Sequence, residues 1–207
     1  MEKNLKKILD ETGLTSAKPK SSAGLPEPLR RATAQVRKKY GGADEFLRTF
    51  NPDLQISIAS NVERAFTGTS PSLTLVKLAY AEELLTVWIM AQLENLNEFC
   101  GVSEKMSVPQ MESLARLISV EFHYFKVSEL MLFFHRFKCG KYGQFYGVVD
   151  PQKIMTAIQA FAIDRRNEIR RIEDRQRQEE LDRLRDEWRT SPENISYEEY
   201  LRRKTKT

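Results

Sequence analysis

Residues 73–99 read LTLVKLAYAEELLTVWIMAQLENLNEF, and this stretch decides the fold class. Apolar side chains cover most of its helical circumference, which is typical of a helix buried on all sides. The apolar run 84–93 is about half as long as a bilayer span requires, and Glu83 and Glu94 flank it. The stretch therefore predicts the central helix of a core, ended by Gly101, and no membrane-spanning segment.

Helical spacing continues on both sides of this stretch. Apolar residues recur at intervals of three and four over 56–66, 111–122 and 130–137. Helix-start patterns, in which a cap residue precedes an early proline, occur at Ser70-Pro71, Ser107-Val108-Pro109-Gln110 and Asp150-Pro151. The only strand-like run is 142–149, where Gly alternates with Tyr and Phe. The sequence predicts an all-α fold, a compact helical bundle with a tight loop or a short β-hairpin near 142–149.

The charges divide the chain into three predicted parts. Residues 1–50 carry a net charge of +5 and form a flexible basic arm, with a Pro/Gly/Ser-rich linker at 12–28. Residues 51–163 carry −2 and form the helical core domain. Residues 164–207 carry +1 and form a long charged C-terminal helix and tail; the segment 164–189 holds nine basic and nine acidic residues. A basic arm is compatible with DNA or with an acidic protein surface as partner, and a charged rod allows a homo-oligomer.

The cysteines and the N-terminal residues predict a location in the cytoplasm. Cys100 and Cys139 are far apart and form no CxxC pair, which suits a reducing compartment. Charged residues interrupt each apolar run among residues 1–9, so no secretory signal is expected.

Aromatic and basic residues are concentrated between Phe122 and Tyr146. This stretch holds nine of the twenty aromatic residues, together with four basic residues and one acid. Rings that stack on bases and cations that follow phosphates are typical of single-stranded nucleic acid binding. The alternative is that the phenylalanines between 122 and 137 are core residues at helical spacing. The Gly-rich loop 140–147 is the part in which binding residues would be expected.

The candidate nucleic-acid or partner-binding residues come from this stretch and from the basic helix 29–39. They are Arg136, Lys138, Lys141, Tyr142, Phe145, Tyr146, Arg30, Arg31, Arg37 and Lys38. The alternative for the helix is packing on the core through Leu29, Ala32 and Val36, with a solvated basic face. Gly140-Lys141-Tyr142-Gly143 has the GxxG spacing of a KH loop, but the flanking strands of that fold are missing.

No pattern in the chain predicts catalysis, a cofactor or a bound metal. Neither histidine lies near a serine or cysteine in a recognisable nucleophile motif, and we expect a protein that is not an enzyme. Cys100, His123, His135 and Cys139 could in principle form a Cys₂His₂ zinc site, although their spacing matches no known pattern. The alternative is two small thiols and two polar histidines at helix edges.

Five runs of residues resemble an uncharacterised family of small helical proteins from Bacteroidetes, their phages and mobile elements. The runs are YAEEL (80–84), NLNEF (95–99), KMS (105–107), FHYFKV (122–127) and FHRFKCGKYG (134–143). The resemblance covers roughly residues 55–170 and leaves the arm and the C-terminal helix outside. It implies a bacterial or phage cytoplasmic setting and, by association with mobile elements, a role in DNA transactions.

Two function classes follow from these observations. The first is a non-enzymatic accessory protein of phage or mobile-element DNA metabolism, such as a replication or helicase-loading adaptor that contacts DNA and a protein partner. The second is a purely protein-binding or structural assembly module without nucleic-acid contact.

Overall fold

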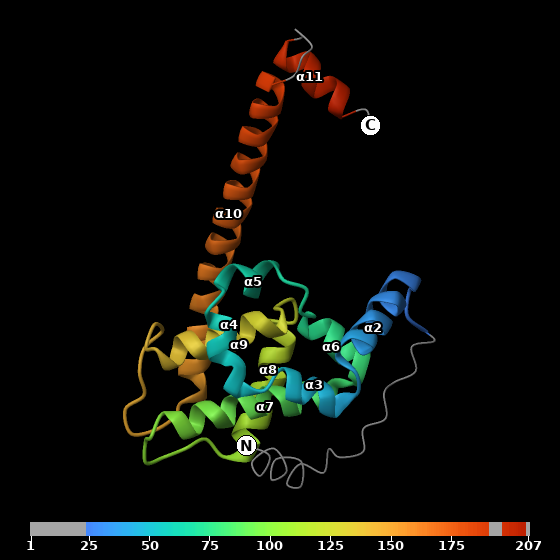
Figure 1. Cartoon of the computed structure of the whole chain (residues 1–207). Helices are drawn as coiled ribbons and strands as arrows, with labels where there is room; N and C mark the ends of the chain where they lie inside the picture. Colours follow the sequence, from blue (N-terminus) through green and yellow to red (C-terminus); the bar gives the residue numbers. More distant parts are fainter. Residues whose placement is uncertain (1–23, 191–195, 206–207) are drawn as a thin grey trace. The chain divides into compact units, whose positions relative to one another are not determined.

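The computed structural model describes residues 24–190 and 196–205, and these are mostly helical (Figure 1). The prediction of an all-α fold is confirmed. The predicted helix at 2–11 and most of the predicted linker at 12–28 lie outside the described residues. The helices are α2 (Glu27–Tyr40), α3 (Ala43–Thr49), the 3-10 turn η3 (Pro52–Leu54), α4 (Gln55–Ala59), α5 (Val62–Thr67), α6 (Leu73–Tyr80), α7 (Glu82–Phe99), α8 (Val108–Glu121), α9 (Val127–Lys138), α10 (Pro151–Thr190) and α11 (Tyr197–Lys204).

Helix α7 is the centre of the core, as its sequence predicts. Its residues 85–90 are buried at six consecutive positions, so this helix has neighbours on all sides. It contacts α6, α8, α9 and η3. The Nε1 atom of Trp88 donates to the Phe50 carbonyl oxygen at 2.8 Å, which satisfies the polar atom of the largest buried side chain. Helices α6, α8 and α9 and the turn η3 are therefore packed around α7.

The stretch 73–99 forms two helices instead of the one that its sequence predicts. The break lies at Ala81, which is buried and has a φ of 116°, a region that residues with a side chain rarely adopt. No glycine or proline marks this position, so the sequence pattern gave no sign of the break. The first helix also begins later than the Ser70-Pro71 pattern predicts, because Ser72 is the cap and its Oγ accepts from the Leu75 amide.

Replacing Ala81 with glycine is expected to raise the free energy of unfolding. Holding a residue with a side chain in such a sparsely populated backbone region lowers the stability of the fold by about 1–3 kcal/mol. Glycine removes this strain, but its greater flexibility in the unfolded chain offsets about 0.5–1 kcal/mol of the gain. The matched control is Ala79→Gly, a buried alanine in the last turns of α6, which should lower stability by about 1 kcal/mol. Urea unfolding of both variants measures the change in the free energy of unfolding. A lower value for Ala81→Gly than for the wild type would contradict the claim that the backbone at Ala81 is strained.

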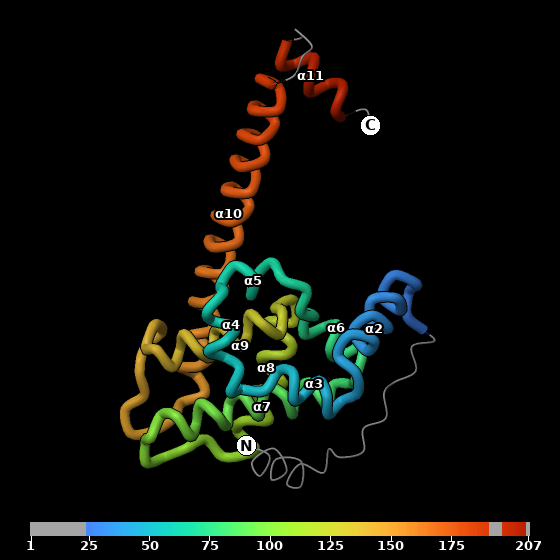
Figure 2. The backbone as a smooth tube through the Cα atoms, viewed as in Figure 1, coloured from blue at the N-terminus to red at the C-terminus, as the bar shows by residue number. Residues whose placement is uncertain are grey.

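The segment 55–67 also contains a break that its periodicity does not predict. Asn61 begins α5 by accepting from the Arg64 amide at 2.9 Å, and α4 ends at Ala59. The carbonyl groups at the end of α5 are satisfied from a distant part of the chain. The Nζ atom of Lys126 donates to the Phe66 and Gly68 carbonyl oxygens at 2.5 and 2.8 Å. Lys126, which the sequence places among the basic residues of the aromatic stretch, is thus a helix-capping residue. Figure 2 shows α4 and α5 following one another along the backbone on the side of α9, with which both are in contact.

The hydrophobic core begins before residue 51, where we predicted the boundary of the basic arm. Helix α2 packs against α6 and against α3. Phe46 is fully buried and lies 5.0 Å from the Phe50 ring, 5.1 Å from the Tyr80 ring and 6.4 Å from the Trp88 ring. The described part of the predicted arm therefore contributes side chains to the same core as α7.

Of the two alternatives predicted for 142–149, a tight loop or a short β-hairpin, the structure has a loop, and the hairpin is not confirmed. None of the residues that the structure describes belongs to a strand, and this segment makes one isolated bridge, between Glu104 and Val148. The Glu104 amide donates to the Gly147 carbonyl oxygen at 3.0 Å, and the Val149 amide donates to the Glu104 carbonyl oxygen at 2.9 Å. The glycines in and just before this segment have positive φ angles, 81° at Gly140, 105° at Gly143 and 79° at Gly147, so the chain turns too often to form two paired strands.

The chain divides into two compact units, Met1–Ile163 and Asp164–Thr207, with the boundary inside α10. In the second unit α11 contacts the end of α10. The Tyr200 hydroxyl donates to Glu187 Oε2 at 2.8 Å, and the Trp188 and Tyr197 rings are 5.6 Å apart at their centroids. None of the helices in the described parts of the chain has the length and apolar character of a membrane span.

Candidate functional site

The loop 140–149 presents lysine and tyrosine side chains in pairs. Lys141 Nζ lies 5.5 Å from the centre of the Tyr142 ring. Lys153, in the first turn of α10, has its Nζ atom 5.8 Å from the centre of the Tyr146 ring. Tyr146 is 77% exposed, the highest value among the exposed large apolar side chains of residues 24–190 and 196–205. We call Lys141, Tyr142, Tyr146 and Lys153 the loop surface.

A cavity of about 570 Å³ lies beside this loop. Lys141, Tyr142 and Gln144 line it from the loop, and Lys153 lines it from α10. Asp150 is the acidic residue among its lining side chains. With two ammonium groups, one carboxylate and an aromatic ring at its edge, the cavity suits an anionic ligand that carries a flat ring.

Two of the predicted aromatic residues of the loop are partly packed into the core. The Tyr142 ring is 6.0 Å from Phe133 and 6.2 Å from Phe161, and the Phe145 ring is 5.2 Å from Phe137. Both side chains are half-buried. These residues hold the loop against α9 and α10, and Tyr146 is the ring of the loop that solvent reaches most.

Arg136 and Lys138, which we predicted as binding residues, contact the protein interior. The Arg136 guanidinium lies over the Phe66 and Phe161 rings at 6.0 and 5.9 Å. Lys138 Nζ donates to Gln55 Oε1 at 2.8 Å and also binds Asn95 Oδ1. Burial lowers the pKa of Lys138, while Cys100 and Asp53 act in the opposite direction. Arg136 and Lys138 are therefore less accessible than Lys141 to a phosphate.

Lys138, which is half-buried, binds a polar network whose glutamines, Gln55 and Gln92, are buried. Gln55 Nε2 donates to Gln92 Oε1 at 2.7 Å, and Gln92 Nε2 donates to the Phe50 carbonyl oxygen at 3.1 Å. The same carbonyl accepts from Trp88. The network joins Phe50 at the end of α3 to α4, α7 and α9, and its polar side chains have bonding partners, as buried polar groups require.

The basic residues of α2 that we predicted as binding residues differ in whether the protein already supplies a partner for their side chains. Arg30 and Arg31 form ion pairs with Glu27, Arg37 Nε donates to the Ala79 carbonyl oxygen at 2.6 Å, and Lys38 is exposed. The inner face of the helix is formed by Thr33 and Val36, whereas Leu29 is exposed. The helix thus packs on α6, which is close to the predicted alternative of a helix that packs on the core. Thr33 is buried where that alternative expected Leu29.

The zinc alternative is not supported by the positions of its four residues. Among residues 24–190 and 196–205 there is no cluster of three or more His, Cys, Asp or Glu side chains that could hold a metal ion. His123 Nδ1 is 3.0 Å from the Val120 carbonyl oxygen, and His135 Nδ1 is 3.9 Å from Cys139 Sγ. Burial, followed by the charges of Lys138 and Arg136, lowers the pKa of His135.

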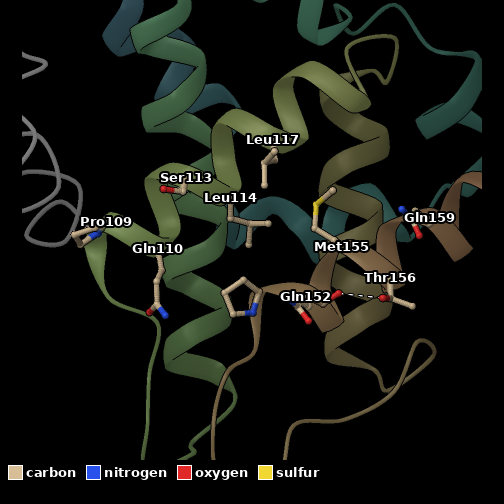
Figure 3. Close-up of a pocket in the computed structure, with 10 residues that line it drawn as sticks. Pro109, Gln110, Ser113, Leu114, Leu117, Gln152, Met155, Thr156 and Gln159 are labelled. Atoms are coloured by element: carbon tan, nitrogen blue, oxygen red, sulfur yellow. Dashed lines mark hydrogen bonds between the residues drawn. The ribbon is translucent and has the colours of Figure 1, made fainter.

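A second candidate surface is a groove between α8 and the first turns of α10. It has a volume of about 540 Å³. Figure 3 shows Leu114, Leu117 and Met155 lining the space between the two helices. The remaining lining residues are uncharged: Pro109, Gln110, Ser113, Pro151, Gln152, Thr156 and Gln159. Leu117 is 53% exposed, and a groove of this composition suits an apolar or amide-bearing protein segment better than a phosphate.

Sequence reasoning missed Lys153 and the groove. Lys153 could have been predicted as a member of the loop surface. It follows the helix-start pattern Asp150-Pro151, and the first turn of a helix lies next to the loop that precedes it. The groove has no comparable sequence signal, since it depends on how α8 and α10 pack.

The chain is similar to a family of unknown function. The model of that family (DUF6633) matches residues 105–207, which include α8, α9, the loop surface and α11. This agrees with the prediction of an uncharacterised family, but the matched part includes the C-terminal helix that we expected to lie outside it. The search of curated proteins gave no match, and the search of solved structures gave none.

Proposed function

We propose that this chain is a non-enzymatic accessory protein of phage or mobile-element DNA metabolism, an adaptor of the replication or helicase-loading type that works in the cytoplasm. Its loop surface contacts single-stranded nucleic acid. The observation that carries this proposal is the pair of lysines, Lys141 and Lys153, each placed over a tyrosine ring beside one cavity. Rings supply stacking that tolerates any base, and the ammonium groups supply attraction to phosphates.

An adaptor also requires a surface for a protein partner, and the groove between α8 and α10 has the chemistry for it. Its lining is apolar or neutral, so a protein segment can bury apolar side chains there without leaving a charge unpaired. The same groove is the observation that favours the second function class, a purely protein-binding or assembly module. The two classes differ in whether the loop surface binds nucleic acid.

Replacing Lys141 and Tyr146 together with alanine is expected to weaken binding of a short oligothymidine at least about tenfold, because one stacked base is worth about 1–3 kcal/mol. Both side chains are exposed, so the melting temperature should change little. Fluorescence anisotropy at about 50 mM salt measures the affinity, since low salt favours phosphate contacts.

The matched control replaces Lys105 and Tyr124, which are also an exposed lysine and an exposed tyrosine, with alanine. It loses the same charge and the same ring, and it should bind as the wild type does. Equal loss in both variants would assign binding to net charge alone. No binding by the wild type at low salt would reject the nucleic-acid contact and leave the protein-binding class.

A further inference from the structure

The exposed half of α10 divides into a basic and an acidic part. Residues 165–177 contain six arginines against three acids, net +3, and residues 178–189 contain three arginines against five acids, net −2. Residues 164–189 carry nine charges of each sign, but the positive charges are concentrated in the first part of the segment and the negative charges in the second. Its basic part has no aromatic residue, since the chain has none between Phe161 and Trp188.

The arginines of the acidic part are paired within the helix. Arg183 lies 2.7 Å from Glu180, Arg185 lies 3.3 Å from Asp182, and Arg189 lies 3.7 Å from Asp186. These pairs at three-residue spacing are worth a few tenths of a kcal/mol each. They nevertheless partly neutralise the guanidinium groups that a polyanion would otherwise attract.

Four arginines of the basic part have no such partner within the part of the chain that the structure describes, namely Arg171 and three others that share one face of the helix. Arg166, Arg170 and Arg177 are exposed, and within residues 24–190 and 196–205 no ion pair or hydrogen bond joins their side chains to an acid. Because each residue turns an α-helix by about 100°, the three lie within an arc of about 40° and span about 16 Å of its axis. We call them the arginine stripe. Glu173 lies on the same face as the stripe, between Arg170 and Arg177 along the helix axis, and Asp174 lies about 40° beyond the other edge of the arc.

We infer that the arginine stripe binds the phosphate backbone of duplex nucleic acid. This inference rests on the proposed function. It adds to the loop surface a second nucleic-acid contact, made by residues of the unit 164–207. A straight helix holds the three guanidinium groups in a line, and duplex DNA offers about one negative charge per 1.7 Å of its axis. Arginine binds phosphate through two parallel N–H donors. Without a ring beside the stripe, base stacking contributes nothing, so binding is independent of sequence and strongly dependent on salt.

Replacing Arg166, Arg170 and Arg177 with glutamine tests the stripe, and Arg183, Arg185 and Arg189 replaced in the same way provide the matched control. Both variants lose three positive charges from one helix, and glutamine has a helix propensity similar to that of arginine. In the full chain, the stripe variant should bind a short duplex at least about 40-fold more weakly at about 50 mM salt. The control should remain within about threefold of the wild type, since its arginines are already paired.

The salt dependence gives a second readout. Each phosphate contact loses about 3.5-fold in affinity when salt rises from about 50 to 200 mM, so three contacts account for about 40-fold. The wild type should therefore lose about 40-fold more than the stripe variant over that range. Circular dichroism of both variants checks that α10 is retained.

The other outcomes overturn the inference. If both variants lose the same affinity for the duplex, binding depends on net charge and not on the stripe. If neither variant loses affinity, the duplex binds to another part of the protein. Binding to anionic lipid vesicles in place of the duplex would make the stripe a membrane-surface contact. If the wild type binds oligothymidine through Lys141 and Tyr146 but binds no duplex, the stripe is rejected while the proposed function stands.

Discussion

Replacing Phe161 with alanine is expected to lower the free energy of unfolding by about 3–5 kcal/mol, the usual cost of removing a buried phenylalanine ring. Phe161 is fully buried and lies where four aromatic residues from three parts of the chain meet. Its ring centre is 6.4 Å from Phe66, 5.6 Å from Phe125, 5.6 Å from Phe133 and 6.2 Å from Tyr142. The cavity left by alanine would remove contacts from all four rings together, and they cannot all move inward to fill it.

The loss should extend to the loop surface, since Tyr142 is held partly by this ring. Arg136 would also lose one of the two rings over which its guanidinium lies. Urea unfolding measures the change in stability, and Phe161→Leu, which keeps most of the volume, should cost less than half as much. Ile163→Ala is the control on the same helix, where 54% of the side chain is exposed, and it should change stability by no more than about 0.5 kcal/mol. A Phe161→Ala variant within about 1 kcal/mol of the wild type would contradict the packing.

The helix starts were largely predictable because they depend on neighbouring residues. The Ser107 capping pattern and the Asp150-Pro151 pattern predict α8 and α10, and the glycine after Tyr40 ends α2. In α8 the Ser107 amide does donate to Gln110 Oε1, at 2.9 Å. Caps of this kind work within one turn, so sequence spacing is sufficient to find them.

The helix breaks and the roles of the lysines were not predictable for the opposite reason. Ala81 interrupts an apolar run without a breaking residue, so what holds it there is tertiary packing. Lys126 and Lys138 belong to the basic and aromatic stretch in the sequence, but one caps α5 and the other binds Gln55, 83 positions away in the chain. A sequence pattern does not distinguish a lysine that faces solvent from one whose partners lie in another helix. Of the aromatic and basic residues predicted for binding in this stretch, Lys141 and Tyr146 are the ones that the fold leaves exposed.

Replacing Lys138 with methionine is expected to lower the free energy of unfolding by about 1–3 kcal/mol, because a buried acceptor then has no donor. Gln55 is 2% exposed, and its Oε1 atom accepts from Lys138 Nζ at 2.8 Å. Methionine keeps the length and the apolar part of the side chain, so the change isolates the ammonium group. Lys105→Met is the control, since Lys105 is exposed and its replacement should change stability by no more than about 0.5 kcal/mol.

The same variant should alter how stability depends on pH. Burial holds the pKa of Lys138 below its ordinary value of 10.5. Between the lowered pKa and 10.5 the unfolded chain binds more protons than the folded chain, so the contribution of Lys138 to stability rises with pH in that window. Below the lowered pKa the cost of burying the charge is fully present, and the neutral amine that forms above it still donates to Gln55. The difference in unfolding free energy between wild type and Lys138→Met, measured by urea unfolding from neutral pH to about 10.5, should therefore grow with pH. A difference that shrinks over this range would show instead that Gln55 and Asn95 stabilise the charged ammonium by more than its burial costs.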